Sequence, residues 1–497
     1  MKKILYVASE CVPFIKTGGL ADVVGTLPKT FSKDEADVRV VIPNYMCMKP
    51  EWKEQMKDVT YFSMDLSWRN QYVGIKELVY EGITFYFIDN EYYFAGPTPY
   101  STMEGDIEKF CYFSKAALSI LPVLDFKPDI IHCHDWQAGL LPVYLKTTFA
   151  GNSFYEDIKT VFTIHNLQFQ GMTGIDRLKD LSGLPAEVFT ADKLECYGGG
   201  NMLKGGLTYA DEITTVSDTY AGEIQMPYYG EKLDGLLRAR NNHLTGIVNG
   251  IDYKIYDPSA DPALTATYSV EDVFEKKSMN KMALQKKTGL PEKKDMFVIG
   301  IISRLTDQKG LDLIDYIMDD LCRDDIQFVV LGSGDPKYEN MFRYYEHKYP
   351  TIVSANICYD DTLSKMMYAG CDAILMPSRF EPCGLCQLMA LRYGTVPIVR
   401  ETGGLKDTVE PFNEYENDGT GFSFTNYNAH DMLHVIEYAK EVYYDQKAQW
   451  NGIVERGMKK DFSWKRSAGI YMDLYEKMLT IVEEEPETED ITDEVEE

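Results

Sequence analysis

Short runs of apolar, β-branched residues alternate with longer segments of helical periodicity along almost the whole chain. Runs of this length are typical of strands buried on both faces, and strands separated by helices build parallel sheets. Five runs lie in the first half of the sequence and four in the second, at residues 4–8, 38–42, 130–132, 161–164, 213–216, 297–302, 328–331, 373–376 and 396–399. The pattern predicts an α/β protein with helices on both faces of each sheet.

A segment near residues 250–262 separates the two sets of strands. Gly246 and Gly250 precede two Asp-Pro pairs at residues 257–258 and 261–262, a composition that is typical of a linker. We therefore expect two doubly wound, Rossmann-like lobes, residues 1–250 and residues 251–482, with a cleft between them.

The charge of the chain excludes one class of partner. It carries 78 acidic and 50 basic residues, a net charge of −28. Ten of the acidic residues and no Lys or Arg lie in residues 483–497, so the rest of the chain has a net charge of −18. A field of this sign repels phosphate backbones, which argues against nucleic-acid binding. Residues 483–497 have too little apolar content to fold, and we expect a disordered acidic tail.

The sequence predicts a soluble protein with no membrane partner. Two lysines stand near the N-terminus, but only five apolar residues follow before Ser9, fewer than the at least about 7 of a signal peptide. No run approaches the roughly 18 apolar residues that a membrane span needs. Ten cysteines are spread from Cys11 to Cys386 without a framework pattern, which favours free thiols in the reducing cytoplasm.

One pattern, Thr-Gly-Gly-Leu-x-Asp, occurs twice, beginning at Thr17 and at Thr402. Each copy is expected to follow a strand and open a helix, where a glycine pair lets bare N–H groups meet an anion. Lys16 adds a positive charge to the first copy. A single copy would favour a turn without a ligand, whereas two copies, one in each lobe, favour a diphosphate bound in the cleft. The glycines are Gly18 and Gly19 in the first copy and Gly403 and Gly404 in the second.

A basic segment directly follows the first strand expected in the second lobe. Arg304 can hold phosphate oxygens through two parallel hydrogen bonds, and Lys309 adds a point charge five residues later. Ligands of open α/β sheets lie beyond the carboxyl ends of the strands, where this segment falls. The alternative is a solvated basic turn. Gly332 and Gly334 weakly resemble a dinucleotide-binding loop, but a third glycine at the right spacing is missing.

A carboxylate, Glu381, follows the strand expected at residues 373–376 and precedes Gly384. At such a position, before a glycine that opens a helix, it is well placed to hydrogen-bond sugar hydroxyls. Cys383 and Cys386 could suggest a metal or redox site, but no second Cys-x-x-Cys pair stands at zinc-site spacing.

The run from His132 to Asp135 invites a metal interpretation too, although hydrogen-bonded structure at a strand end is favoured. We therefore expect no metal ion and no cofactor.

Together these segments resemble glycosyltransferase family 5, which contains the bacterial glycogen synthases and the plant starch synthases. The matching motifs run in order from residue 3 to about residue 475: Lys16-Thr-Gly-Gly-Leu-Ala-Asp-Val, His132-Cys-His-Asp-Trp-Gln-Ala-Gly, Phe162-Thr-Ile-His-Asn-Leu, Ser303-Arg-Leu-Thr-Asp-Gln-Lys-Gly, Ser378-Arg-Phe-Glu-Pro-Cys-Gly-Leu, Tyr393-Gly-Thr-Val-Pro and Thr402-Gly-Gly-Leu. The resemblance implies the GT-B fold, with an N-terminal lobe on the acceptor side and a C-terminal lobe on the nucleotide-sugar side. The last helices are expected to pack back on the N-terminal lobe.

The resemblance also implies roles for individual residues. Lys16, Arg304 and Lys309 would contact the diphosphate of ADP-glucose, His165 would lie against the donor glucose, and Glu381 would begin the glutamate motif of the family. The catalytic set would be Glu381, His165, Arg304 and Lys309, and the cleft would be lined by Lys16, Gly18, Gly19, Tyr100, Asp135, Asn249, Cys383, Gly384, Thr402, Gly403 and Gly404.

One position separates family 5 from its neighbours. Met389 stands eight residues after Glu381, where many other retaining GT-B transferases have a second glutamate. Family 5 also lacks that glutamate, and no function is assigned to Cys133 or Cys386.

By this resemblance, the chain would be a retaining glucosyltransferase that moves glucose from ADP-glucose to the non-reducing 4-hydroxyl of an α-1,4-glucan and so elongates glycogen. Two alternatives stay open: another GT-B transferase that uses UDP-glucose or makes a small glycoside, and a catalytically silent glucan-binding protein. The intact set of Lys16, Arg304, Lys309 and Glu381 argues against the second.

Overall fold

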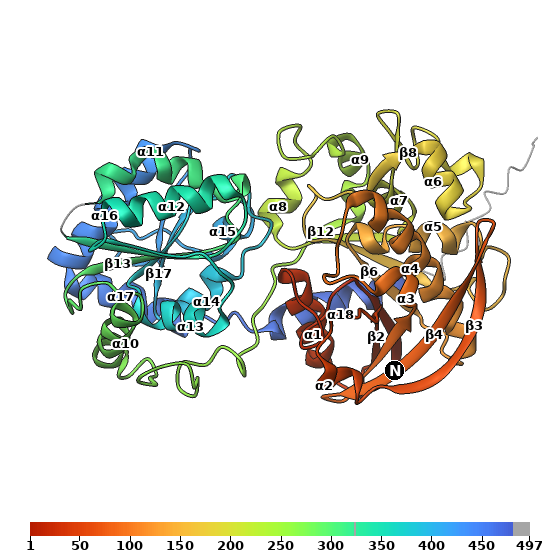
Figure 1. Ribbon diagram of the computed structural model, residues 1–497, viewed down its shortest axis with the longest axis horizontal. Coiled ribbons are helices and arrows are strands. Elements are labelled where there is room, and N and C mark those ends of the chain that lie inside the picture. Colours follow the sequence, from red (N-terminus) through yellow and green to blue (C-terminus); the bar gives the residue numbers. More distant parts are fainter. Residues whose placement is uncertain (323–324, 481–497) are drawn as a thin grey trace, which may run out of the picture.

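The computed structural model describes residues 1–322 and 325–480, so the predicted acidic tail at residues 483–497 lies outside the described residues. Two α/β lobes stand side by side (Figure 1). Each has its own hydrophobic core: one is formed by residues 4–247 together with residues 464–478, the other by residues 251–458.

The N-terminal lobe is built on a nine-stranded sheet. Its strands are β1 (Lys2–Val7), β2 (Ala36–Pro43), β3 (Lys57–Leu66), β4 (Arg69–Tyr80), β5 (Ile83–Asp89), β6 (Ile130–His134), β7 (Lys159–Ile164), β11 (Glu212–Thr215) and β12 (Leu244–Gly246). Their order in the sheet is β12-β11-β7-β6-β1-β2-β5-β4-β3. The strands from β12 to β5 are parallel, and β4 and β3 add an antiparallel hairpin at one edge. The strand ends that carry the sequence motifs therefore meet along one side of the sheet.

Helices and a small sheet complete this lobe. A three-stranded sheet joins β8 (Met172–Gly174), β10 (Gly199–Asn201) and β9 (Glu195–Cys196). The α-helices are α1 (Gly19–Thr30), α2 (Pro50–Lys53), α3 (Glu91–Phe94), α4 (Met103–Val123), α5 (Leu141–Lys146), α6 (Ile175–Ser182), α7 (Met202–Tyr209), α8 (Asp218–Glu223) and α9 (Asp234–Ala239). Several begin after a side chain that caps the first turn; Ser217, for example, accepts a hydrogen bond from the N–H of Tyr220.

The C-terminal lobe is a six-stranded, all-parallel sheet. Its strands are β13 (Phe297–Ile302), β14 (Ile326–Leu331), β15 (Val353–Asn356), β16 (Ala373–Met376), β17 (Val396–Arg400) and β18 (Phe422–Phe424), in the order β15-β14-β13-β16-β17-β18. The helices are α10 (Val273–Lys287), α11 (Leu311–Leu321), α12 (Pro336–Lys348), α13 (Asp361–Gly370), α14 (Cys386–Arg392), α15 (Gly403–Thr408), α16 (Ala429–Asp445) and α17 (Lys447–Lys459). Helices α11 and α12 cover one face, and α13 and α14 cover the other (Figure 1).

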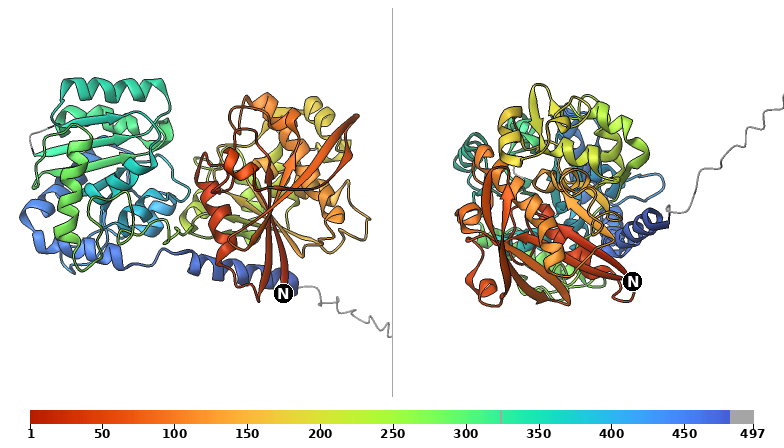
Figure 2. Two further views of the ribbon diagram at one scale, coloured as in Figure 1. Left: turned by 60° about the horizontal axis from the view of Figure 1, so that its bottom comes forward. Right: turned by 90° about the vertical axis from the view of Figure 1, so that its right-hand side faces the viewer.

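The last helix, α18 (Trp464–Thr480), returns to the N-terminal lobe (Figure 2). Its Tyr475 is fully buried there, with its hydroxyl 2.8 Å from that of Tyr6 and 2.7 Å from Nδ1 of His132. The chain thus crosses between the lobes twice, and the two crossings meet where the N–H of Ile251 donates to the carbonyl of Phe462.

The fold class predicted from the sequence is confirmed. All nine expected strands are present, as β1, β2, β6, β7, β11, β13, β14, β16 and β17, with bounds that differ by at most two residues. The hairpin of β3 and β4 was not expected, because β3 is largely exposed and buries only Met64 and Leu66. Within residues 1–322 and 325–480, no helix has both the length and the apolar character that crossing a bilayer requires.

Candidate active site

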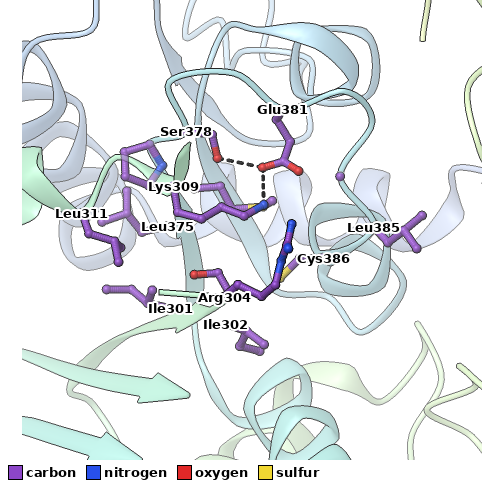
Figure 3. Close-up of a pocket in the computed structure, with 14 residues that line it drawn as sticks. Ile301, Ile302, Arg304, Lys309, Leu311, Leu375, Ser378, Glu381, Leu385 and Cys386 are labelled. Atoms are coloured by element: carbon purple, nitrogen blue, oxygen red, sulfur yellow. Dashed lines mark hydrogen bonds and ion pairs between the residues drawn. The ribbon is translucent and has the colours of Figure 1, made fainter. Parts of the chain in front are cut away.

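A pocket of about 120 Å³ opens at the carboxyl ends of β13 and β16 in the C-terminal lobe (Figure 3). These two strands are neighbours in the sheet, so the loops that follow them converge. The pocket is lined by Arg304 and Lys309 from the first loop and by Ser378, Glu381, Gly384 and Cys386 from the second. Fold topology therefore brings together two segments that are about 75 residues apart in sequence, as expected for adjacent parallel strands.

Glu381 is the buried carboxylate of this pocket. It is 6% exposed, and its Oε2 accepts hydrogen bonds from Nζ of Lys309 at 2.6 Å and from Oγ of Ser378 at 2.8 Å (Figure 3). Gly310 allows the close approach: its φ is +69°, and a Cβ there would lie 2.0 Å from the carbonyl oxygen of Pro377. The turn that carries Lys309 can thus pack directly against the loop that carries Glu381.

Arg304 is the second cation of the pocket. Its guanidinium makes no ion pair or hydrogen bond with the residues that the structure describes, and it extends toward Lys309 and Cys386 (Figure 3). An exposed arginine beside a buried Lys–Glu pair gives the pocket a net positive charge of one. The arrangement suits an anion with several oxygens.

The first Thr-Gly-Gly turn lies across from this pocket, in the N-terminal lobe. The carboxylate of Glu10, which is 3% exposed, accepts hydrogen bonds from the N–H and Oγ1 of Thr17 and from the N–H of Gly18. It also accepts one from the hydroxyl of Tyr100. A Cβ on Gly18 would meet nothing within 4 Å, and one on Gly19 would approach only Leu385 of the opposite lobe, at 3.5 Å. The glycines of this turn thus face the space between the lobes.

The second Thr-Gly-Gly turn, like the first with Glu10, lacks the free N–H groups that the sequence predicts. Oγ1 of Thr402 and the N–H of Gly403 donate to Glu223 of the N-terminal lobe, and the N–H of Gly404 donates to the carbonyl of Glu381. A Cβ on Gly403 would lie 1.9 Å from that same carbonyl oxygen. The glycine pair is thus explained by close packing against the Glu381 loop, and in this conformation its amides are already paired with protein groups.

His165 and Asp135 stand at the carboxyl ends of β7 and β6. Oδ1 of Asp135 accepts a hydrogen bond from the N–H of His165 at 2.7 Å, and Nε2 of His165 lies 3.0 Å from Nδ1 of His134. Burial lowers the pKa of His165 to about 3 and raises the pKa of Asp135 to about 7. The imidazole of His165 is therefore neutral at physiological pH and can offer one hydrogen bond to a sugar hydroxyl.

The metal interpretation of the histidine run finds no support in its contacts. Both ring nitrogens of His132 are engaged, Nδ1 with Tyr475 and Nε2 with Oγ1 of Thr163 at 2.5 Å. In residues 1–322 and 325–480, no three His, Cys, Asp or Glu side chains are grouped so that they could hold a metal ion. His132 thus ties α18 to the sheet through Tyr475.

The remaining predicted residues lie around the two lobes' facing surfaces. Nζ of Lys16 pairs with Asp22 at 2.8 Å. Asn249, at the first crossing between the lobes, is buried, and its Oδ1 has no hydrogen-bond partner among the described residues. Cys383 is buried beside Gly384, whose φ is +72°. Burial raises the pKa of the Cys383 thiol to about 12, so that it stays protonated.

The sequence analysis missed Tyr359, as well as Glu10, Ser378 and Glu223, in this region. Tyr359 follows β15, at the same edge of the C-terminal sheet, and is 79% exposed. It lies close enough to Lys16 to contribute, with Asp22 and Asp361, to raising the pKa of that lysine against the opposing effect of burial. No strand was expected at residues 353–356, so the position of Tyr359 after a strand carried no signal in the sequence.

Comparison with known proteins extends these observations. Residues 3–239 match the family model described as starch synthase catalytic domain, and residues 281–451 match that of glycosyl transferases group 1. The chain is 62% identical over 478 residues to the glycogen synthase of Lachnospira eligens, which covers 96% of this chain and 100% of the relative. It is 50% identical over 477 residues to that of Geobacillus stearothermophilus, with 96% and 98% covered.

Solved structures agree with the sequence matches. The catalytic domain of starch synthase IV from Arabidopsis thaliana, bound to ADP and acarbose, superposes with a TM-score of 0.89 at 32% identity, covering 96% of this chain and 99% of that one. A sucrose-phosphate synthase from Thermosynechococcus elongatus shares the fold, with a TM-score of 0.59 at 16% identity and 96% and 99% coverage. Because these similarities span nearly the whole of both lobes, the chain belongs to the family of bacterial glycogen synthases and starch synthases, GT-B glucosyltransferases that elongate α-glucans.

Proposed function

We propose that the donor is ADP-glucose and that its diphosphate binds between Arg304 and Lys309, in the pocket beside Glu381. The observation that carries the proposal is the convergence of two cations and one buried carboxylate at the carboxyl ends of β13 and β16. The relative bound to ADP and acarbose supports an adenine nucleotide. Tyr359 offers an exposed aromatic face at the same sheet edge against which the base can stack.

The two cations act on the leaving group. As the bond between glucose and the β-phosphate breaks, negative charge builds on the departing ADP, and preorganised donors stabilise that charge most where it develops. Arg304 supplies a planar fork for two phosphate oxygens, and Lys309 supplies a compact charge. Lys16, from the opposite lobe, adds a third cation when the cleft closes around the donor.

Glu381 acts on the sugar. Its Oε2 is held by Lys309 and Ser378, whereas its Oε1 has no hydrogen-bond partner among the described residues. A carboxylate held at one oxygen and free at the other can accept a hydrogen bond from a sugar hydroxyl. Its negative charge also stabilises the oxocarbenium-like transition state. Neutral His165, with Asp135 behind it, contacts the same glucose from the N-terminal lobe.

The acceptor approaches from the N-terminal lobe. We assign residues 1–250 to the acceptor side and residues 251–482 to the nucleotide-sugar side, with transfer of glucose to the non-reducing 4-hydroxyl of an α-1,4-glucan and retention of configuration. A Cβ on Gly18 would meet nothing within 4 Å, and one on Gly19 would approach only Leu385 of the opposite lobe, so this face of the first lobe has room for a ligand, which supports the assignment. We assign the enzyme to the cytoplasm; its ten free cysteines fit a reducing compartment.

A comparison of donors tests the proposal. Initial rates of glucose transfer onto glycogen are measured with ADP-glucose and with UDP-glucose, and proton NMR identifies the anomeric configuration of the new linkage. We expect a much larger kcat/KM with ADP-glucose and an α-1,4 product. Equal or better use of UDP-glucose would overturn the donor assignment, and a β-linked product would overturn retention.

A further inference from the structure

The short helix α8 of the N-terminal lobe lies beside α15 of the opposite lobe (Figure 1). It is hydrogen-bonded to that lobe around the loop that carries Glu381. Oγ of Ser217, which caps α8, donates to the carbonyl of Pro382 at 2.5 Å. The N–H of Thr219 donates to Asp407 at 2.9 Å, and its hydroxyl donates to the same carboxylate. Glu223, the last residue of α8, accepts from Oγ1 of Thr402 at 2.8 Å.

This contact lies at the junction of the lobes. The start of α8 packs against Gly246, the last residue of β12 before the chain first crosses over; a Cβ there would lie 2.4 Å from the carbonyl oxygen of Ser217. Helix α15 faces α8 across the junction (Figure 1). The α8 contact therefore lies next to the strand from which the chain first crosses to the other lobe.

Glu223 is linked to the Glu381 peptide through a single turn. Besides Thr402, its carboxylate accepts the N–H of Gly403, at 3.1 and 3.2 Å for the two oxygens. The next N–H, that of Gly404, donates to the carbonyl of Glu381 at 3.1 Å. A Cβ on Gly403 would lie 1.9 Å from that carbonyl oxygen. Because the two are packed so closely, a shift of the turn toward the Glu381 peptide displaces that peptide as well.

The carboxylate of Glu223 is nearly buried and fully hydrogen-bonded to the turn. It is only 9% exposed, and its two oxygens are shared between one hydroxyl and one N–H of the turn. Asp407, four residues after Gly403 in α15, accepts hydrogen bonds from Thr219 of the same α8, and among the described residues its carboxylate makes no hydrogen bond to the turn or to the Glu381 loop. The two carboxylates thus offer a matched pair in one interface.

We propose that Glu223 is a positioning residue: from the N-terminal lobe it holds the Thr402–Gly403 turn, and through that turn it sets the position of Glu381 in the opposite lobe. The inference rests on the role proposed for Glu381. It explains why the second glycine pair is buried in the junction between the lobes. It also gives the N-terminal lobe a direct influence on the carboxylate beside the donor site.

The test compares Glu223→Gln with Asp407→Asn in the full-length enzyme. Glutamine keeps the size of Glu223, and its amide oxygen can replace Oε1, which accepts from both Thr402 and Gly403; its NH₂ group replaces Oε2, so the N–H of Gly403 loses one of its two acceptors. We expect kcat to fall between about tenfold and 100-fold, the scale of a small misplacement of a reacting group, while KM for ADP-glucose stays close to that of the wild type. Asp407→Asn weakens the same interface without touching the turn, and its kcat should remain near that of the wild type.

A second substitution distinguishes a loss of positioning from a folding defect in Glu223→Gln. Thr402→Val removes only the hydroxyl that donates to Glu223, and a double-mutant cycle with Glu223→Gln should show that the two losses in kcat are not additive. Melting temperatures of all variants are measured in parallel. Equal losses of kcat in Glu223→Gln and Asp407→Asn, or a rise in KM alone, would overturn the inference. If Glu381→Gln itself retains kcat, the proposed role of Glu381 fails instead.

Discussion

Nζ of Lys309 lies 2.6 Å from Oε2 of Glu381, and both residues line the pocket at the carboxyl ends of β13 and β16. The carboxylate is nearly buried and the ammonium is partly so, with side-chain exposures of 8% and 16%. Each charge therefore depends on the other for compensation, since an unpaired charge in a buried position is costly. Arg304, in the same pocket, has no such partner among the described residues, and this difference separates two of the predictions below.

Replacing Glu381 with Gln should lower kcat by on the order of 10²-fold or more, because the carboxylate charge acts in the transition state. Binding of ADP-glucose, measured by isothermal titration calorimetry, should change far less, since the amide keeps the shape of the side chain. A variant with near-normal kcat would show that Glu381 has another role.

Arg304→Ala and Lys309→Ala should each reduce kcat by on the order of 10²-fold or more, the scale seen when one donor to a developing anion is lost. Their stabilities should differ. Lys309→Ala leaves Glu381 buried without its cation and should lower the free energy of unfolding by about 3 kcal/mol, whereas Arg304→Ala should unfold like the wild type. Urea denaturation of both variants checks this contrast; equal stability would contradict the importance of the ion pair.

Activity should be unchanged in excess EDTA. The chain contains no Asp-x-Asp pair of the kind that holds a divalent ion in GT-A transferases, and Lys16, Arg304 and Lys309 carry the charge that a cation would otherwise provide. The measurement is the initial rate with and without chelator, and with added Mg²⁺ or Mn²⁺. Loss of activity in EDTA that a metal ion restores would refute this account.

Asp135→Asn should alter the pH dependence of stability. The pKa of Asp135 is about 7 in the folded enzyme, raised by burial above the about 3.9 of an unfolded chain. Protonated Asp135 therefore stabilises the wild type at low pH, and this contribution is lost as the pH rises to 7 and beyond. Since asparagine does not ionise, the stability of the variant relative to the wild type should increase between pH 5 and pH 8. The melting temperatures of the two proteins are measured across this pH range. A difference between them that does not change with pH would contradict the raised pKa of this carboxyl.

Removal of residues 483–497 should leave turnover unchanged, because the segment is acidic, nearly free of apolar residues and remote in sequence from every motif. Its ten negative charges should instead favour solubility. Glycogen affinity and kcat of the truncated enzyme are compared with those of the full chain. A several-fold change in either would assign the segment a role in glucan binding.

The amino-acid sequence determined the fold class and the positions of the main cations and the carboxylate. Continuous apolar runs between helical segments can only be buried as parallel strands covered on both faces, which fixes where the strands end. Arg304 and Glu381 stand shortly after two such runs, and Lys309 lies in the same loop as Arg304, so all three were expected at the carboxyl edge of the sheet; the pairing of β13 with β16, which brings them together, was decided by the topology.

Tertiary structure decided how the two Thr-Gly-Gly turns are used. Their sequences are nearly the same, yet the glycines of the first face the space between the lobes, whereas those of the second are packed against the Glu381 loop. The carboxylate that pairs with the second turn, Glu223, comes from 180 residues away and from the other lobe. A local pattern predicts where N–H groups can donate hydrogen bonds. Which acceptor they bond to is decided by the packing of distant segments, because each buried N–H group needs a partner.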